Sequence, residues 1–173
     1  MIFRTLTIFV FFISSILSCG KDDINALNTP KTILEFANAT PGLSIFTQAV
    51  NKTDVNVLLQ DNNASLTVFA PSNVAFKTYF ETNNFSSIND VPIGQLKQLL
   101  LYNMVNKVLL QEDLTTGAVN TLAKQNDNCL SLLIQVNDTA ITLNNDASVD
   151  ITDFKAINGV MHIVNKITPI PTL

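Results

Sequence analysis

The spacing of apolar residues changes from a helical period to a strand period along the chain, and this change limits the folds that the chain can adopt. Between residues 33 and 106, apolar residues recur at intervals of three and four, as on one face of a helix. From Leu130 onward they recur at every second position, as on one face of a strand. Helices therefore precede most of the strands, which predicts an α+β domain and not alternating βαβ units.

The first part of the pattern predicts helices over about residues 33–37, 43–50, 73–81 and 93–106. Between the second and third helices, residues 66–70 form a short β-rich run that ends at Pro71, and Ser72 can cap the helix that follows. The apolar stripe of the last helix includes Asn103. A polar side chain is therefore expected at a core-facing position.

The second part of the pattern predicts an antiparallel sheet. A strand over residues 130–136 is followed by a turn at residues 137–138 and a strand through residues 141–143. Asn158-Gly159 suits a tight turn, because this dipeptide tolerates left-handed backbone conformations. The turn leads into a β-branched strand over residues 160–167.

The first eighteen residues have the layout of a targeting segment. Arg4 is their only charged residue, and the apolar run from Leu6 to Leu17 is shorter than the roughly 20 residues that span a bilayer. A basic start, an apolar stretch and then small residues are typical of a secretory signal. Residues 1–18 are therefore predicted to be a signal peptide and are left out of the fold.

Residues 16–19, Ile-Leu-Ser-Cys, resemble the lipobox of bacterial lipoproteins. The resemblance implies cleavage before Cys19 and acylation of Cys19, and residues 20–23 resemble a surface-export tag of lipoproteins of the Bacteroidetes. Residues 19–30 are then the lipidated cysteine and a polar tether, and the chain is expected on the bacterial outer membrane or cell surface. The alternative is an ordinary signal peptide with a cysteine nearby.

Residues 31–172 are left to form a single domain, which is large enough to bury a hydrophobic core. Once Cys19 is acylated, Cys129 is the one remaining thiol, so no intramolecular disulfide is expected. Ten basic and fourteen acidic residues give a formal charge of −4, and no block of Lys or Arg could follow a phosphate backbone. Nucleic acid is therefore not an expected partner.

The sequence offers few groups for catalysis or metal binding. His162 is the only histidine and stands between two valines of its strand face, as a hydrogen-bonded core histidine does. Cys129 and His162 are the one pair of a nucleophile and a base that could meet in the fold to form a catalytic dyad. The sequence has too few Cys and His residues to bind a zinc ion. The Asn- and Asp-rich turns at residues 61–63 and 144–146 lack the EF-hand pattern of a calcium site. We expect no enzymatic activity, no cofactor and no metal.

Three stretches resemble the fasciclin (FAS1) family in order and spacing: TVFAPSNVAF at residues 67–76, LLLYNMV at residues 99–105 and NGVMHIVNKI at residues 158–167. The resemblance covers about residues 31–172. It implies an α+β fold in which a wedge of two β-sheets is flanked by a group of helices from the N-terminal half. The motif positions expected to be structural are Thr67, Phe69, Pro71, Ser72, Phe76, Asn158, Gly159 and His162.

Tyr102 and Asn103 stand where the family has a Tyr-His pair that has been linked to receptor adhesion in animal relatives. Asn103 can donate and accept hydrogen bonds, but it cannot titrate near neutral pH as a histidine would. Two interpretations stay open for this pair, an adhesion motif or core support for the helix that precedes the sheet. The second is favoured.

The expected function is that of a membrane-anchored extracytoplasmic module for adhesion or protein–protein binding. Its partner would be an extracellular or envelope protein, a glycan or a second copy of the chain. The alternative is an envelope lipoprotein that captures a carbohydrate or another small ligand for an uptake system. Sugar stacking calls for aromatic platforms, and the chain has no Trp and only Tyr79 and Tyr102, both expected to face the core.

Overall fold

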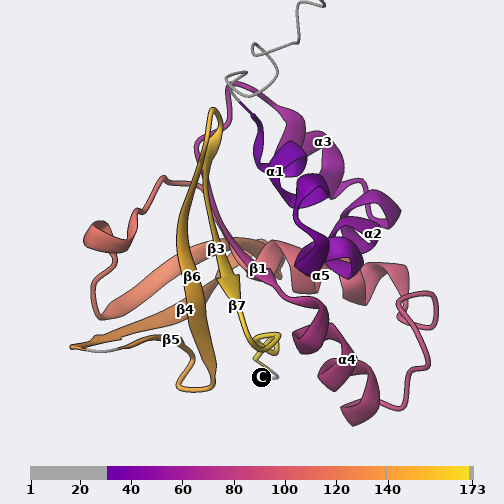
Figure 1. Cartoon of the computed structure of the whole chain (residues 1–173). Helices are drawn as coiled ribbons and strands as arrows, with labels where there is room; N and C mark the ends of the chain where they lie inside the picture. Colours follow the sequence, from indigo (N-terminus) through magenta and orange to yellow (C-terminus); the bar gives the residue numbers. More distant parts are fainter. Residues whose placement is uncertain (1–30, 139, 172–173) are drawn as a thin grey trace, which may run out of the picture.

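The computed structural model describes residues 31–138 and 140–171. The helices gather on one side of the molecule and the strands on the other (Figure 1). The helical elements are α1 (Ile33–Ala39), η2 (Pro41–Leu43), α2 (Ser44–Lys52), α3 (Val55–Gln60), α4 (Asn73–Thr82), α5 (Ile93–Tyr102) and η3 (Gln111–Asp113). The strands are β1 (Leu66–Pro71), β2 (Met104–Val105), β3 (Gly117–Gln125), β4 (Asn128–Asn137), β5 (Ala140–Leu143), β6 (Ala147–Ala156) and β7 (Gly159–Val164).

The strands form one seven-stranded sheet in the order β2-β1-β7-β6-β5-β4-β3. β1 and β7 are parallel, and the other neighbouring pairs are antiparallel. The α+β fold class expected from the sequence is thus confirmed. The parallel pair is a feature that the periodicity did not predict.

The two sheets expected from the family resemblance are continuous here, because β6 takes part in both. The first residues of β6 pair with β5, and the rest of the strand pairs with β7. The register against β7 shifts on either side of Ile151, and Asp153 has a φ of 64°. Such irregularities bend a strand, so β6 joins the two halves of the sheet at an angle.

β1 and β7 separate two parts of the hydrophobic core. Leu66, Val68 and Ala70 of β1 pack with the helices in one cluster. Phe69 packs on the other side, in a cluster with residues of β3, β4 and β5. Every residue of β1 and of β7 is buried. Strands buried on both faces read as continuous apolar runs in the sequence, which is why residues 66–70 were recognised as a strand.

The helices expected at residues 33–37, 43–50 and 73–81 correspond to α1, α2 and α4. The helix expected over 93–106 is shorter, because α5 ends at Tyr102 and Met104–Val105 pair with β1 as β2. The strand expected over 160–167 ends at Val164. α3, β3 and β6 were not predicted. No helix in the described part of the chain combines the length and apolar character that a membrane crossing requires.

Candidate functional site

His162 lies inside the molecule, between β1 and the loop that precedes η3. Its side chain is fully buried and stacks on Phe69, with ring centroids 5.4 Å apart. The backbone N–H of Asp153 donates to Nδ1 at 3.2 Å, so the ring proton is on Nε2, which donates to the carbonyl oxygen of Leu109 at 2.9 Å. Burial lowers the pKa of His162, while the Leu109 hydrogen bond and the Asp153 charge act in the opposite direction. The neutral imidazole is a structural connector in this position.

Thr67 and Asn158 both connect the starting end of the parallel strand pair to its surroundings. The Thr67 hydroxyl accepts from the N–H of Leu109 at 2.8 Å and donates to the carbonyl oxygen of Lys107. Asn158 Oδ1 accepts from the N–H of Ile33 at 2.9 Å, and its Nδ2 donates to the carbonyl oxygen of Leu59 at 2.9 Å. Asn158 therefore joins the start of α1 to the end of α3.

Gly159 follows Asn158 in a conformation that only glycine adopts easily. Its φ is +145°, and a Cβ atom added there would lie 2.0 Å from the carbonyl oxygen of Leu66. Leu66 and Gly159 face each other in the parallel pair. The close approach of the two strands at this point therefore requires a residue without a side chain.

The remaining residues of the first motif join β1 to α4. Pro71 is the last residue of β1, and Ser72 is the N-cap of α4, where its Oγ accepts from the N–H of Ala75 at 3.2 Å. Phe76 is fully buried in the helical cluster and lies against Phe80. These contacts fix the direction in which the helix leaves the sheet.

Tyr102 and Asn103 are both buried. The Tyr102 hydroxyl donates to the carbonyl oxygen of Ser131 at 2.9 Å and accepts from Asn144 Nδ2 at 2.9 Å, which joins α5 to the β-sheet. Asn103 Nδ2 donates to the carbonyl oxygen of Leu99 at 2.9 Å, while its Oδ1 has no partner. Neither side chain is available to a partner at the surface. Cys19, the predicted lipidation site, lies outside the described residues.

The chemical groups singled out in the sequence do not form a reactive cluster. Cys129 is exposed on β4, which two strands separate from the buried His162 on β7. In the two turns considered for calcium, Asp61 Oδ1 accepts from the N–H of Asn63, Asn144 Oδ1 accepts from the N–H of Leu133, and Asp146 pairs with Lys166. Within residues 31–138 and 140–171, no three His, Cys, Asp or Glu side chains lie where they could share a metal ion.

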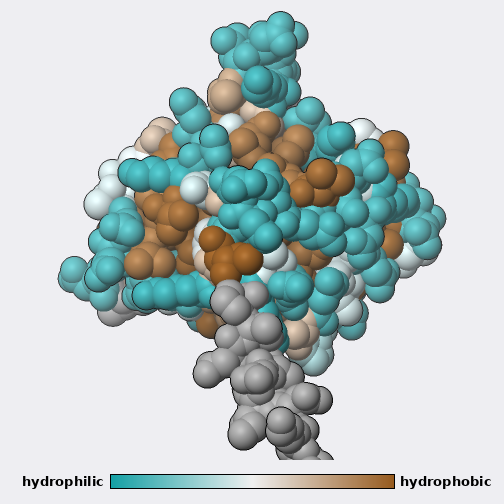
Figure 2. Space-filling model, turned by 90° about the horizontal axis from the view of Figure 1, so that it is seen from above, coloured by the Kyte–Doolittle hydropathy of each residue, from teal (hydrophilic) through white to brown (hydrophobic). Residues whose placement is uncertain are grey.

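Exposed apolar side chains are dispersed over the surface. Viewed from above, the molecule shows separate apolar areas set among hydrophilic ones (Figure 2). The large exposed apolar residues belong to different helices, strands and loops: Val57, Val74, Ile93, Val108, Ile151 and Ile157. Isolated exposed apolar side chains are common in soluble domains and by themselves indicate no partner.

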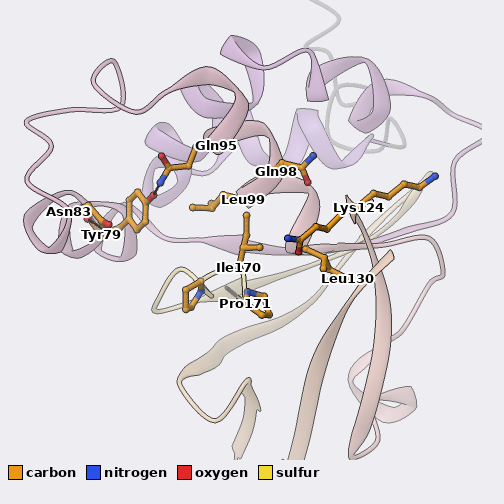
Figure 3. A pocket seen from close by; sticks show the side chains of 11 residues that line it. Tyr79, Asn83, Gln95, Gln98, Leu99, Lys124, Leu130, Ile170 and Pro171 are labelled. Carbon is orange, nitrogen blue, oxygen red and sulfur yellow. Dashed lines mark hydrogen bonds between the residues drawn. The ribbon is translucent and has the colours of Figure 1, made fainter. Parts of the chain in front are cut away.

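A hollow of about 680 Å³, here called the Tyr79 hollow, brings together four separate segments. Tyr79 and Asn83 come from α4 and the residue after it, and α5 supplies Gln95, Gln98 and Leu99 (Figure 3). The opposite wall consists of Lys124 and Gln125 of β3, Leu130 of β4 and the segment Pro169–Pro171. A smaller hollow of about 310 Å³ shares Tyr79, Asn83 and Pro169 with it and reaches the Asp146–Lys166 pair.

Tyr79 only partly meets the expectation that it faces the core, because it packs against the helical cluster at the edge of that cluster. Its helical spacing with Phe76 and Phe80 predicted a core position, but the side chain is half-buried and lines both hollows. Gln95 Nε2 donates to its hydroxyl oxygen at 2.9 Å. Burial raises the pKa of Tyr79 above its usual value, and the Gln95 hydrogen bond acts in the opposite direction. No sequence pattern connects Tyr79 with Lys124 or Ile170, so the hollow could be found only in the fold.

Comparison with known proteins gives similarity at the levels of sequence and fold. The sequence model of the family described as "Fasciclin domain" matches residues 41–169. Transforming growth factor-beta-induced protein ig-h3 of Sus scrofa is 33% identical over 103 residues, which are 60% of this chain and 14% of that protein. Protein sll1483 of Synechocystis is 28% identical over 142 residues, which are 82% of this chain and 75% of that protein.

Among solved structures, the fold is similar to a FAS1 domain pair from the insect cell adhesion molecule Fasciclin I. The TM-score is 0.66 at 15% sequence identity, and the match covers 80% of this chain and 51% of that chain. This chain thus spans about half of the insect structure and a small part of the porcine protein. At this level of identity, the structural match concerns the fold alone.

Proposed function

This chain belongs to the fasciclin domain family, and on that basis we propose that it is a lipid-anchored module that binds a protein partner at the bacterial cell surface. Fasciclin domains generally take part in adhesion or protein–protein interaction. The observation that carries the proposal is the burial of the motif side chains Thr67, Phe69, Phe76, Tyr102 and His162. Because these side chains are buried inside the fold, a partner would have to be recognised by other residues at the surface.

The anchoring part of the proposal is supported by residues 16–19 and by the position of residue 31. The lipobox-like sequence places the acylated cysteine twelve residues before the first described residue. The described chain begins at one end of the molecule, whereas α4 and the last described residues lie toward the other end (Figure 1). An anchor at Cys19 would attach the tether to the end of the domain opposite α4.

The anchoring is tested with the substitution Cys19→Ser in the full chain. We expect the wild-type protein in the membrane fraction and the variant in the soluble fraction, because two or more acyl chains hold a protein to a bilayer essentially permanently. Cys129→Ser is the matched control and should stay in the membrane fraction. Membrane retention of Cys19→Ser would contradict the lipid anchor.

The adhesion is tested with bacteria that carry the full chain at their surface. We expect more of these bacteria to attach to a layer of untreated cells than of bacteria that produce the Cys19→Ser variant. Protease treatment of the layer should abolish the attachment, and periodate oxidation of its glycans should not. Equal attachment of the two cell types would contradict the proposed function.

Capture of a carbohydrate is the second candidate. It is favoured by the four amide side chains that line the Tyr79 hollow: Asn83, Gln95, Gln98 and Gln125. Amides can donate to and accept from sugar hydroxyls. A glycan array would test it, and saturable binding of an oligosaccharide together with attachment that is sensitive to periodate would favour this function over adhesion to a protein.

A further inference from the structure

We propose that the Tyr79 hollow binds a short extended segment of a partner protein that carries an aliphatic side chain next to a carboxylate. This inference rests on the proposed function and assigns it a site and a ligand chemistry. The hollow has a volume of about 680 Å³, within the roughly 300–1,000 Å³ of small-molecule and side-chain pockets. A few residues of an extended chain could therefore lie in it.

The apolar part of the hollow selects an aliphatic side chain. Leu99, Leu130 and Ile170 line it together with Pro169 and Pro171, so most of its apolar surface is aliphatic. The single aromatic side chain, Tyr79, already packs against the rings of Phe80 and Phe85, with centroids 6.3 Å and 6.2 Å away. A sugar ring, which stacks best on a free aromatic face, would find little of one here.

The polar part of the hollow suits a peptide backbone. Gln98 and Gln125 offer both donors and acceptors, as a backbone with alternating N–H and C=O groups requires. Gln98 Oε1 is buried and has no hydrogen-bond partner. A buried acceptor without a partner is unfavourable, and a rotation of the Gln98 side chain would bring this oxygen to an N–H group of a bound segment.

The charge of the hollow selects a carboxylate. Among the described residues, Lys124 is the one charged side chain that lines it, in a chain whose formal net charge is −4. Lys124 is exposed and lies at the rim of the hollow away from Tyr79, with its ammonium group extending outward (Figure 3). In the adjoining smaller hollow, Asp146 is already paired with Lys166. An acidic segment would therefore meet a positive charge at Lys124 and no carboxylate side chain from residues 31–138 or 140–171 in the lining of the Tyr79 hollow.

The experiment is a selection of random seven-residue peptides, displayed on phage, against the full chain purified in detergent. We expect the enriched peptides to share an aliphatic residue next to Asp or Glu. A synthetic copy of the most enriched peptide is then titrated into methyl-labelled protein. Its binding should shift the methyl resonances of Leu99, Leu130 and Ile170 more than those of Val57, which is exposed on α3.

Two variants test the charge and the apolar contact separately. Lys124→Glu should weaken binding of the acidic peptide about fivefold, because it replaces an attraction by a repulsion. Lys77→Glu is the matched control, since Lys77 is exposed on α4 and lines neither hollow. The affinity of this variant for the acidic peptide should equal that of the wild type. Ile170→Asp should abolish binding, and an unchanged circular dichroism melting curve would show that the variant is folded.

Three outcomes would overturn the inference: no enriched peptide, shifts confined to residues outside the hollow, or equal weakening by Lys124→Glu and Lys77→Glu. Binding of oligogalacturonate in the hollow without peptide binding would assign the site to an acidic sugar and also overturn it. The result of the attachment experiment with intact cells does not depend on which site of the protein binds the partner. If attachment is seen and Lys124→Glu does not change it, the proposed function holds and the site assignment is wrong.

Discussion

The β1–β7 pair and the Tyr79 hollow are built in opposite ways. Residues of β1 and β7 lie in parallel register, buried on both faces, and they carry the motif side chains Thr67, Phe69 and His162. The hollow is assembled from two helices, a hairpin and the C-terminal segment, and Leu99 is its only residue from the three motif stretches. The residues of the three motif stretches thus maintain the fold, whereas most of the groups that could meet a partner come from outside these stretches.

Gly159→Ala should have the largest effect and tests the strand pair directly. The added Cβ would lie 2.0 Å from the carbonyl oxygen of Leu66, at a φ of +145°. Because both the backbone conformation and the close strand contact would be lost, we expect no cooperative thermal unfolding by circular dichroism. Gly117→Ala on β3 is the control, since its Cβ would meet nothing within 4 Å. A normal melting curve for Gly159→Ala would contradict the claim that the close contact between β1 and β7 maintains the fold.

Phe76→Ala should reduce the free energy of unfolding by about 3–5 kcal/mol, because it leaves a cavity where a fully buried ring stood. Urea denaturation measures this loss. Val74→Ala, two residues earlier on α4 and 68% exposed, should change stability by no more than about 0.5 kcal/mol. Similar losses for the two variants would contradict the assignment of the first motif to the core.

His162 should make the stability of the fold depend on pH. Burial lowers its folded pKa below the roughly 6.5 of an unfolded chain, so the stability it contributes is fully present above that pH. As the pH falls further, the unfolded state binds a proton that the folded state does not bind. The free energy of unfolding should then fall by at most about 1.4 kcal/mol per pH unit, until the folded pKa is reached.

Urea titrations between about pH 7.5 and pH 5.5 measure this dependence, and the lower limit avoids the titration of most carboxylates. The variant His162→Gln has no ring to titrate and should show a smaller slope than the wild type, whatever its absolute stability. Equal slopes would show that His162 is not the group responsible.

Lys166→Ala should have the smallest effect and tests the exterior. Lys166 and Asp146 form an ion pair whose side chains are 47% and 40% exposed. Water and salt screen such a pair, so we expect a change of about 1 kcal/mol or less in the free energy of unfolding. Urea denaturation in low and high salt checks this. A loss of unfolding free energy as large as that of Phe76→Ala would contradict the claim that surface residues contribute much less to stability than core residues do.

The sequence predicted the parts of the fold in which burial produces a regular pattern. Leu96, Leu99 and Leu100 predicted α5 from their spacing, and the apolar run of β1 predicted a buried strand. The end of α5 was missed, because the apolar residues Met104 and Val105 continue the chain's hydrophobic pattern although they pair with β1. That pairing is a tertiary contact which local spacing does not encode.

The elements that were not predicted have weak periodicity. β6 is largely exposed or half-buried and is interrupted at Ile151 and Asp153, so it does not alternate. Burial alternates over residues 117–123 of β3, but its buried residues are Thr121 and Ala123, which give only a weak apolar pattern. α3 has only six residues. The Tyr79 hollow could not be predicted for a different reason, because Tyr79, Gln98, Lys124 and Ile170 come together only when four segments pack.

The position of β7 has a consequence for when the protein can fold. β7 is the last strand of the chain, yet it lies beside β1 in the middle of the sheet. Contacts between segments so far apart in sequence form late, because a long loop must close first. During synthesis, the centre of the sheet stays open until residues 159–164 leave the ribosome. The signal peptide predicted at residues 1–18 would direct the chain across a membrane, and this delay would keep the chain unfolded until then.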